Sequence, residues 1–387
     1  MSSIRKVCVV ITARPSYSRV KTLLQAITDN PKLELQLVVA ASALLERYGN
    51  AVKQIEEDGF RISRKVYSVL DGETPLTSAK TTGLGLIELS SVFDDLGPDL
   101  VVTIADRYET ISTAIAASYM NIPLVHIQGG EVTGSIDEKV RHAITKLADI
   151  HFVSTACAAT RVIKMGERPE SVFNTGCPSI DLARDAAMSM DVKMNPFDKY
   201  GGVGGECFDL EKGYSIVMQH PVTTEYQDAR MQITETLLAI EKYGRSVFWF
   251  WPNVDAGSDA TSKGIRAFRE THQPRNIRFF KNMSPRDFLV LLMRSDMIIG
   301  NSSVAIRECA YLGIPAVNIG SRQTGRERGK NVIDVPHEQE AILQAIKLQE
   351  NHGKYESEHL YGDGYSGQRM ADILTTVPLS HVKRLAY

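Results

Sequence analysis

The feature that most constrains the fold is an alternation, along the whole chain, of short β-branched runs with longer amphipathic segments. The short runs are almost continuously apolar, which is typical of strands buried on both faces of a parallel sheet. The expected strands span residues 6–12, 35–40, 99–105, 122–128, 149–155, 214–219, 246–252, 277–281, 296–300 and 315–320. Strands and helices that alternate at this spacing predict a doubly wound α/β fold.

The length of the chain and a restart of the pattern near residue 213 predict two domains. A chain of 387 residues exceeds what one core usually organises. Segment 185–212 is rich in glycine and polar residues, so we place the junction there, with domains at 1–185 and 186–370. Open α/β sheets bind ligands at the carboxyl ends of their strands, so we expect two Rossmann-like domains facing a cleft.

Composition excludes several classes of function. The chain has 44 basic and 46 acidic residues and no polybasic cluster, which argues against nucleic-acid and membrane-surface partners. The five cysteines are scattered without a CxxC pair, which argues against a disulfide framework or a zinc site. The apolar run near the N-terminus is too short for a signal peptide or a membrane span. We therefore expect a cytoplasmic protein with reduced thiols.

Two groups of polar residues directly follow expected strands in the first half. Arg14 lies in the first βα turn, where a guanidinium and a helix N-terminus could hold a phosphate; the alternative is a surface arginine. Asp106 and Arg107 follow the strand at 99–105. An aspartate there could simply cap the next helix, but in this fold the position faces the ligand.

A denser polar segment follows the strand at 122–128. A double glycine at 129–130 would let the backbone approach a ligand closely. Glu131 and Asp137 come next, and Arg141 with a histidine lies one helical turn beyond Asp137. Carboxylates beside a group of variable protonation suit removal and return of a proton at carbon. The alternative makes Glu131 a loop residue and Asp137 a helix cap.

In the second half, polar residues again follow strands. His220 precedes a proline and is expected in an extended conformation, although a lone histidine is more often structural. Asn253 and Asp255 lie in a turn-rich segment after the next strand. A basic, glycine-rich loop at 320–331, which contains Arg322, suits closure over phosphates.

The most specific local pattern is GNSSVAIRECAYLG at 300–313. Ser302 and Ser303 would open a helix that Gly313 closes, and hydroxyls with free backbone N–H groups at a helix N-terminus form an anion site. Glu308 would lie a turn and a half further on the same helix, where a carboxylate can accept both hydroxyls of a ribose. A nucleoside diphosphate fits this arrangement; ordinary serine capping with an exposed glutamate is the alternative. No GxGxxG motif is present, so a nicotinamide or flavin dinucleotide is not expected.

Taken together, these motifs resemble the hydrolysing UDP-N-acetylglucosamine 2-epimerase family, whose members begin the synthesis of sialic and related nonulosonic acids. The resemblance covers nearly the whole chain. It rests on ADRYE, HIQGGEVTGSIDEKVRHAITKLA, QHPVTTE, PNVDAGS, IGNSSVAIRE, GIPAVNIGSRQTGRERG and YGDG at 361–364. It implies the two-domain fold shared with GT-B glycosyltransferases, with a C-terminal helix at 371–387 that crosses back to the first domain.

The resemblance also implies roles for single residues. UDP would lie on the second domain, with Ser302 and Ser303 at the diphosphate, Glu308 at the ribose and uracil near the backbone of Met283. His220 would lie near the glycosyl phosphate. Phosphate contact or cleft closure would fall to Arg14, Ser18, Arg107 and Arg322, and further substrate contacts to Arg141, Asn253 and Asp255.

Asp106, Glu131 and Asp137 would supply the acid–base groups around C2 and C3 of the sugar. In the family mechanism the C2 proton is lost and UDP departs by anti elimination. Water then adds syn to the resulting glycal, which gives a free 2-epimeric sugar of the N-acetylmannosamine type. No metal or redox cofactor is implied, because UDP is already a good leaving group. We also expect a homodimer or homotetramer.

One departure from the family pattern affects the substrate. Many relatives carry a glutamate just before the glycine pair, where this chain has Gln128. Either Glu131 or Asp137 takes that role, or the substrate is UDP-2,4-diacetamido-2,4,6-trideoxyglucose, on the way to legionaminic acid, in place of UDP-N-acetylglucosamine. A glycosyltransferase on the same scaffold, a non-hydrolysing epimerase and a non-catalytic sensor of nucleotide sugars also stay open. The acidic cluster at 131–137 argues against the glycosyltransferase.

Overall fold

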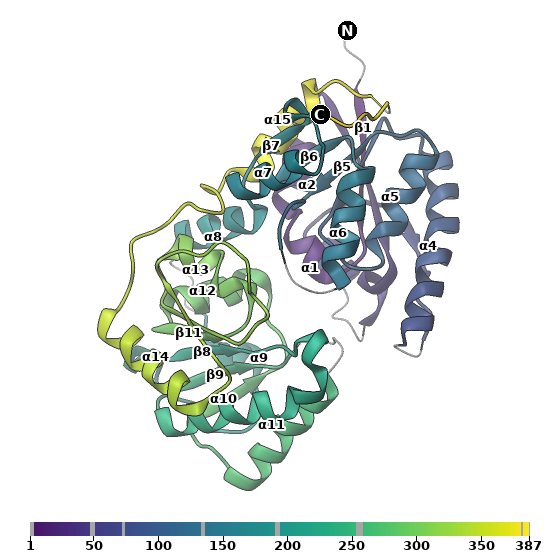
Figure 1. The fold of residues 1–387 in the computed structure, drawn as a ribbon. Coiled ribbons are helices and arrows are strands. Elements are labelled where there is room, and N and C mark those ends of the chain that lie inside the picture. The colour runs from purple at the N-terminus through teal and green to yellow at the C-terminus, as the bar shows by residue number, and fades with distance from the viewer. Residues whose placement is uncertain are drawn as a thin grey trace. The chain divides into compact units, whose positions relative to one another are not determined.

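The computed structural model describes residues 4–46, 51–71, 74–132, 136–189, 194–252, 258–380 and 382–386. These residues form two compact units (Figure 1). Unit 1 comprises residues 4–132, 136–181 and 361–386, within the described ranges, and unit 2 comprises residues 182–360. The predicted domain boundaries at 185 and 370 stay predictions.

Unit 1 is built on a seven-stranded sheet in which every strand pairs in parallel. Chain order reverses between β1 and β4, so the carboxyl ends of these two strands flank the position where such folds bind ligands. In spatial order the strands are β3 (Ile62–Val66), β2 (Leu33–Ala40), β1 (Arg5–Ile11), β4 (Leu100–Ile104), β5 (Leu124–Ile127), β6 (Ile150–Val153) and β7 (Val172–Asn174).

Strand β1 shows why the sheet carries helices on both faces. Its side chains alternate between two hydrophobic cores, because successive residues of a strand point to opposite faces. Val9 packs with residues of α2 and α15, whereas Val10 packs with residues of α4 and α5. The helices of unit 1 are α1 (Arg14–Ser18), α2 (Lys21–Asp29), α3 (Ala51–Glu57), α4 (Pro75–Leu96), α5 (Thr110–Tyr119), α6 (Ile136–Leu147), α7 (Ala156–Lys164) and α15 (Ser366–Thr376).

The last helix returns to the sheet on which the chain begins. α15, yellow in Figure 1, packs against α2, and Met370 and Leu374 enter the core of unit 1. Asp181 fixes this return, because its carboxylate accepts hydrogen bonds from the backbone N–H groups of Ser366 and Gly367 at 2.9 and 2.7 Å. The predicted C-terminal helix that returns to the first domain is confirmed, but its predicted bounds of 371–387 are wrong: the helix is Ser366–Thr376, and the described residues from 377 onward are not helical.

Unit 2 repeats the architecture with a six-stranded parallel sheet that reverses chain order between β8 and β11. Its strands, in spatial order, are β10 (Ile277–Phe280), β9 (Val247–Phe250), β8 (Ser215–Met218), β11 (Met297–Gly300), β12 (Ala316–Ile319) and β13 (Val332–Val335). Its helices are α9 (Pro196–Tyr200), α10 (Ala229–Tyr243), α11 (Ser258–His272), α12 (Pro285–Arg294), α13 (Glu308–Leu312) and α14 (Gln339–His352), and α8 (Pro178–Met188) joins the units in sequence. The predicted class, two Rossmann-like α/β parts, is confirmed.

All ten predicted strands are present, and β3, β7 and β13 were not predicted. These three lie at the edges of their sheets. An edge strand has one neighbour and more exposure, so its sequence need not be continuously apolar. In β3, for example, Arg64 and Lys65 are exposed.

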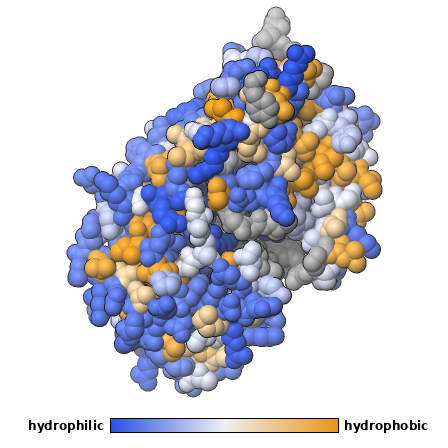
Figure 2. Space-filling model, in the orientation of Figure 1, coloured by the Kyte–Doolittle hydropathy of each residue, from blue (hydrophilic) through white to orange (hydrophobic). Residues whose placement is uncertain are grey.

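The surface carries one group of exposed apolar side chains on α4. Leu76, Leu84 and Ile87 expose 64%, 38% and 65% of their area. Figure 2 shows orange residues gathered where α4 and α5 lie in Figure 1. Within the described ranges, no helix is both long enough and apolar enough to cross a membrane.

Candidate functional site

The carboxyl end of β4 carries the candidate residue Asp106. Its carboxylate forms an ion pair with the guanidinium of Arg141, whose side chain is 2% exposed. Arg141 also donates from Nη1 to the backbone carbonyl of Glu131 at 2.8 Å. One buried arginine of α6 thus joins the loops that follow β4 and β5. It brings Asp106 and Glu131 to the same edge of the sheet.

Glu131 is itself fixed by a neighbouring strand. Its Oε1 accepts a hydrogen bond of 3.1 Å from Ser154, which directly follows β6. Glu131 is 6% exposed, so its carboxylate is largely removed from solvent. Asp137 lies in the first turn of α6, where a negative charge is favoured by the helix dipole. Residues 133–135, between these two carboxylates, lie outside the described part of the chain.

Arg107, next to Asp106, is anchored by Glu109, a residue that the sequence patterns do not single out. Arg107 Nε lies 3.3 Å from Glu109 Oε2, while Glu109 Oε1 accepts from Ser42 Oγ at 3.0 Å. Glu109 is 3% exposed, whereas the side chain of Arg107 is 35% exposed. A buried carboxylate therefore orients a partly accessible cation at the carboxyl end of β4.

Arg14 and Ser18 lie in α1, which follows β1. Strands β1 and β4 are neighbours at the point where the strand order of the sheet reverses. Arg14 is partly buried, and this burial lowers the pKa of its guanidinium. An arginine remains protonated under such conditions, so Arg14 is a desolvated cation suited to an anion. Ser18 donates to the Pro15 carbonyl at 3.0 Å, which closes the turn of α1.

The double glycine at 129–130 makes room for protein atoms. A Cβ on Gly130 would lie 2.4 Å from the Ala158 carbonyl oxygen, and a Cβ on Gly129 would lie 3.0 Å from Thr145 Oγ1. Gly130 also has a φ of 75°, which favours glycine. Close packing against α7 and α6 therefore accounts for both glycines, and the approach of this backbone to a ligand stays a prediction.

In unit 2, His220 and Asn301 hold the carboxyl ends of β8 and β11 together. Asn301 Oδ1 accepts from the His220 backbone N–H at 2.7 Å, and Asn301 Nδ2 donates to the His220 carbonyl at 2.8 Å. Asn301 is 0% exposed and His220 is 5% exposed. Gly300 permits this approach, because a Cβ there would lie 2.1 Å from the Met218 carbonyl oxygen. Asn301 was not selected from the sequence, although it follows a strand.

The prediction of one continuous helix from the serines through Glu308 is wrong. The segment forms a 3-10 turn, η6 (Ser303–Ala305), followed by the separate short helix α13. Ile306 and Arg307, between η6 and α13, keep right-handed backbone angles but belong to neither element. The β-branched residues between the serines and Glu308 lower the local helix propensity. The predicted end at Gly313 is confirmed, since Gly313 is left-handed with φ 67°.

The two serines and Glu308 nevertheless lie close in sequence at the carboxyl end of β11. Ser302 Oγ accepts from Val304 N at 3.4 Å, and Arg307 Nη2 donates to Ser303 Oγ at 2.7 Å. Glu308 is 7% exposed. Among the described residues, its Oε2 has no hydrogen-bond partner, although Arg307 Nε lies 3.9 Å away. A buried carboxylate oxygen without a donor is an acceptor ready for a ligand hydroxyl.

The remaining predicted residues of unit 2 lie in different environments. Arg322 Nη1 donates to the Asn301 carbonyl at 3.2 Å, and Gln323 Nε2 donates to the same oxygen at 2.8 Å, so the basic loop folds onto the end of β11. Met283 is 6% exposed and belongs to the core beneath the sheet. Asn253 and Asp255 lie outside the described residues.

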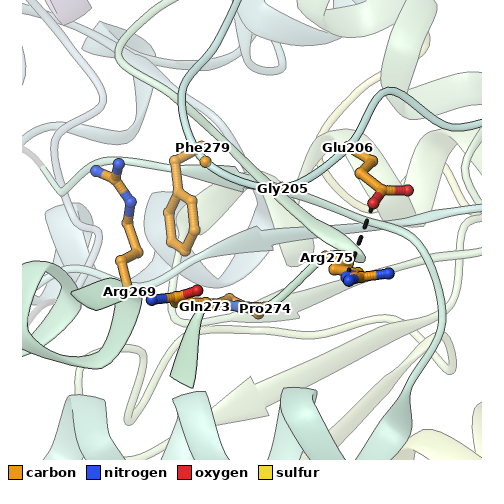
Figure 3. A pocket seen from close by; sticks show the side chains of 8 residues that line it. Gly205, Glu206, Arg269, Gln273, Pro274, Arg275 and Phe279 are labelled. Carbon is orange, nitrogen blue, oxygen red and sulfur yellow. Dashed lines mark ion pairs between the residues drawn. The ribbon is translucent and has the colours of Figure 1, made fainter. Parts of the chain in front are cut away.

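A pocket of about 340 Å³ lies elsewhere on unit 2 (Figure 3). Gln273 and Arg275 on its lining precede β10, so the pocket lies toward the amino end of this edge strand. Figure 3 shows Arg269 beside the ring of Phe279, and Glu206 paired with Arg275 at 3.8 Å. None of the predicted site residues lines this pocket. Within the described ranges, no cluster of three or more His, Cys, Asp or Glu side chains could hold a metal ion.

Comparison with known proteins agrees with the resemblance seen in the motifs. A family model described as UDP-N-acetylglucosamine 2-epimerase matches residues 25–375. The chain is 34% identical to the UDP-N,N'-diacetylbacillosamine 2-epimerase (hydrolyzing) of Legionella pneumophila, over 97% of each chain. It is 35% identical to the polysialic acid biosynthesis protein P7 of Escherichia coli, over 90% of this chain and 86% of that protein.

A solved structure with the same fold is the UDP-GlcNAc 2-epimerase from Neisseria meningitidis bound to UDP-GlcNAc. It superimposes with a TM-score of 0.79 at 16% identity, over 95% of this chain and 99% of that one. At this identity the likeness establishes the fold. The family match and the relatives above 30% identity establish more: this chain belongs to the UDP-N-acetylglucosamine 2-epimerase family.

Proposed function

We propose that this chain is a hydrolysing 2-epimerase, which converts a UDP-activated N-acetyl amino sugar and water into UDP and the free 2-epimeric sugar. The observation that carries the proposal is the Asp106–Arg141–Glu131 assembly at one sheet edge, together with the buried acceptor of Glu308 in unit 2. The first group suits proton transfer at carbon, and the second suits a ribose. Membership of the family and the named activity of the Legionella relative support the same reaction.

The chemistry assigned to unit 1 is acid–base catalysis at C2. Arg141 stabilises the ionised form of Asp106, which a proton acceptor needs. When a carboxylate removes the C2 proton, the released electron pair forms the C1–C2 double bond. The bond from C1 to the diphosphate oxygen then breaks, and its electrons leave with UDP. In the second half, a water oxygen adds to C1 and gives up a proton to a carboxylate, while a carboxylic acid among Asp106, Glu131 and Asp137 returns a proton to C2 on the face opposite to the one that lost it.

The chemistry assigned to unit 2 is binding of UDP and stabilisation of the leaving diphosphate. Ser302 and Ser303 would donate to the diphosphate, and the carboxylate of Glu308 would accept from the ribose hydroxyls. His220, held by Asn301, would meet the glycosyl phosphate. Arg14, Arg107 and Arg322 would supply positive charge as negative charge develops on the departing oxygen.

Two substrates are proposed, and a specific observation favours each. UDP-N-acetylglucosamine is favoured by the family description. UDP-2,4-diacetamido-2,4,6-trideoxyglucose is favoured by the Legionella relative, which is named for UDP-N,N'-diacetylbacillosamine and matches 97% of the chain. Either product would enter nonulosonic acid synthesis. The cytoplasmic location and the homodimer or homotetramer expected from the sequence stay predictions.

The test is incubation with each UDP-sugar in deuterated water, followed by proton NMR. We expect free UDP and a free sugar with inverted C2 that carries deuterium at C2. An intact UDP-sugar as the sole product would assign the chain to the non-hydrolysing epimerases. UDP release that requires a sugar acceptor would indicate a glycosyltransferase, and no reaction with either UDP-sugar would exclude the proposal.

A further inference from the structure

A closed chain of contacts lies beneath Asp106 and includes two buried residues that the proposed chemistry does not use. His126, in β5, is 0% exposed, and its Nε2 lies 2.9 Å from the Ala105 carbonyl. Its Nδ1 lies 3.1 Å from Thr145 Oγ1, and Thr145 Oγ1 lies 3.0 Å from the Arg141 carbonyl one turn earlier in α6, so one hydroxyl proton faces both acceptors. Arg141 then pairs with Asp106, the residue after Ala105. We call this closed chain the His126 ring.

The tautomer of His126 follows from its partners. A carbonyl oxygen can only accept, so the proton lies on Nε2, and Nδ1 is an acceptor for the hydroxyl proton of Thr145. Burial lowers the pKa of His126 to about 3, so the imidazole is neutral at physiological pH. A neutral imidazole in this tautomer can link the end of β4 to α6, and it needs no counter-charge in the buried interior.

The backbone that the ring holds is strained. Ala105 has a φ of 65°, a conformation that is unfavourable for a residue with a Cβ and that persists only where the surroundings impose it. Ala105 is held from β5 on both sides: its N–H donates to the Ile127 carbonyl at 3.0 Å, and its carbonyl accepts from His126. Because Asp106 is the next residue, these two bonds set where its side chain begins.

The first glycine of the pair at 129–130 leaves space for the ring. A Cβ on Gly129 would lie 3.0 Å from Thr145 Oγ1 and 3.2 Å from His126 Nδ1. Such contacts are tighter than ordinary van der Waals packing, so a larger residue would push the two partners apart. The glycine is thus explained by the ring.

We propose that His126 and Thr145 are positioning residues, which fix Asp106 and the Arg141 segment of α6 in the geometry that proton transfer at the sugar requires. This role rests on the proposed epimerase function. The competing interpretation is that the ring contributes only to the stability of the core. The two differ in kcat, because a stability role leaves the turnover of the folded enzyme unchanged.

The test uses matched threonine substitutions in the full-length protein. Thr145→Val keeps the shape and removes the hydroxyl, whereas Thr145→Ser keeps the hydroxyl. The control is Thr103→Val, because Thr103 pairs with His126 in register, is 1% exposed and, among the described residues, has an Oγ1 without a hydrogen-bond partner. Each variant is compared for kcat, KM and amide hydrogen exchange of the peptide covering residues 105–110.

We expect Thr145→Val to lower kcat about 10- to 100-fold with KM within about twofold, since small displacements of catalytic groups can cost about 10²-fold. Exchange at 105–110 should rise in this variant. Thr145→Ser should recover most of the kcat, and Thr103→Val should match the wild type.

Separate outcomes overturn the two proposals. Unchanged kcat in Thr145→Val, with normal wild-type turnover, overturns the positioning role even if the variant is less stable. Unchanged exchange at 105–110 overturns the claim that the ring holds this turn, and that readout needs no activity. Absence of wild-type turnover with every UDP-sugar overturns the proposed function and the catalytic part of this inference together.

Discussion

Glu308→Gln should weaken UDP binding through the loss of one charge-assisted hydrogen bond to the ribose. Glu308 is 7% exposed, and its Oε2 lacks a hydrogen-bond partner among the described residues, so a ribose hydroxyl would meet a desolvated acceptor. Glutamine has nearly the same shape and keeps one acceptor oxygen. A hydrogen bond to a charged group contributes about 1.5–3 kcal/mol. Since 1.4 kcal/mol is tenfold in affinity, the Kd for UDP should rise about 10- to 100-fold.

Isothermal titration calorimetry with UDP and 2'-deoxy-UDP separates this contact from indirect effects. In the wild type, removal of the 2'-hydroxyl should cost about as much as the mutation does. In Glu308→Gln, the same removal should cost clearly less, because the partner is already gone. Glu270→Gln, on the exposed side of α11, is the control and should leave both affinities unchanged.

Two results would refute the reasoning. An unchanged Kd for UDP in a folded Glu308→Gln protein would move the ribose to another site. A Kd that rises equally for UDP and 2'-deoxy-UDP would exclude a contact between Glu308 and the 2'-hydroxyl.

Three further predictions concern the other parts of the site. The double variant Ser302→Ala/Ser303→Ala should weaken UDP binding, since each hydrogen bond to a charged phosphate contributes about 1.5–3 kcal/mol; unchanged affinity by calorimetry would place the diphosphate elsewhere. Amide replacement of the candidate acid–base residues should lower turnover about 10²–10⁴-fold while UDP still binds, and a variant blocked only in hydration should release a glycal with a vinylic proton signal. These replacements are Asp106→Asn, Glu131→Gln and Asp137→Asn; near wild-type rates in all three would make His220 the leading base. Burial lowers the pKa of His126 to about 3, so below about pH 6.5 the unfolded chain gains a proton that the folded chain does not, and His126 should remove about 1.4 kcal/mol of stability per pH unit on acidification. Urea unfolding between pH 7 and 5 should therefore show a shallower pH dependence of stability in His126→Gln than in the wild type. An equal pH dependence would contradict the burial argument.

Central strands were predictable from the sequence because their environment dictates their composition. β1 and β4 lie in the middle of a sheet, buried on both faces, so nearly every position must be apolar. β3, at an edge, pairs only with β2 and contains ISRKV, in which charged residues face solvent. No periodicity distinguishes such a segment from a loop, and only its pairing with β2 makes it β-structure.

Candidate site residues were predictable where topology alone places them. The carboxyl ends of parallel strands are known once the strands are known, which is how Asp106, Glu131 and His220 were selected. Residues that act through a distant partner were not selected. Asn301 is an example, because its role depends on the backbone of His220, 81 residues earlier in the chain. Any Asn after a strand would look the same in the sequence.

Gln128 stands where many relatives carry a glutamate, and its contacts give a local reason for the amide. Its side chain is 2% exposed, with Oε1 accepting from Arg19 at 3.2 Å and Nε2 donating to the Cys177 sulfur at 3.1 Å. The Cys177 sulfur also lies 3.1 Å from Ser179 Oγ. An amide offers a donor and an acceptor on one group, so it serves both neighbours at once. Gln128 therefore links α1 to the start of α8, and the burden of proton transfer in the proposed reaction falls on the carboxylates held by Arg141 and Ser154.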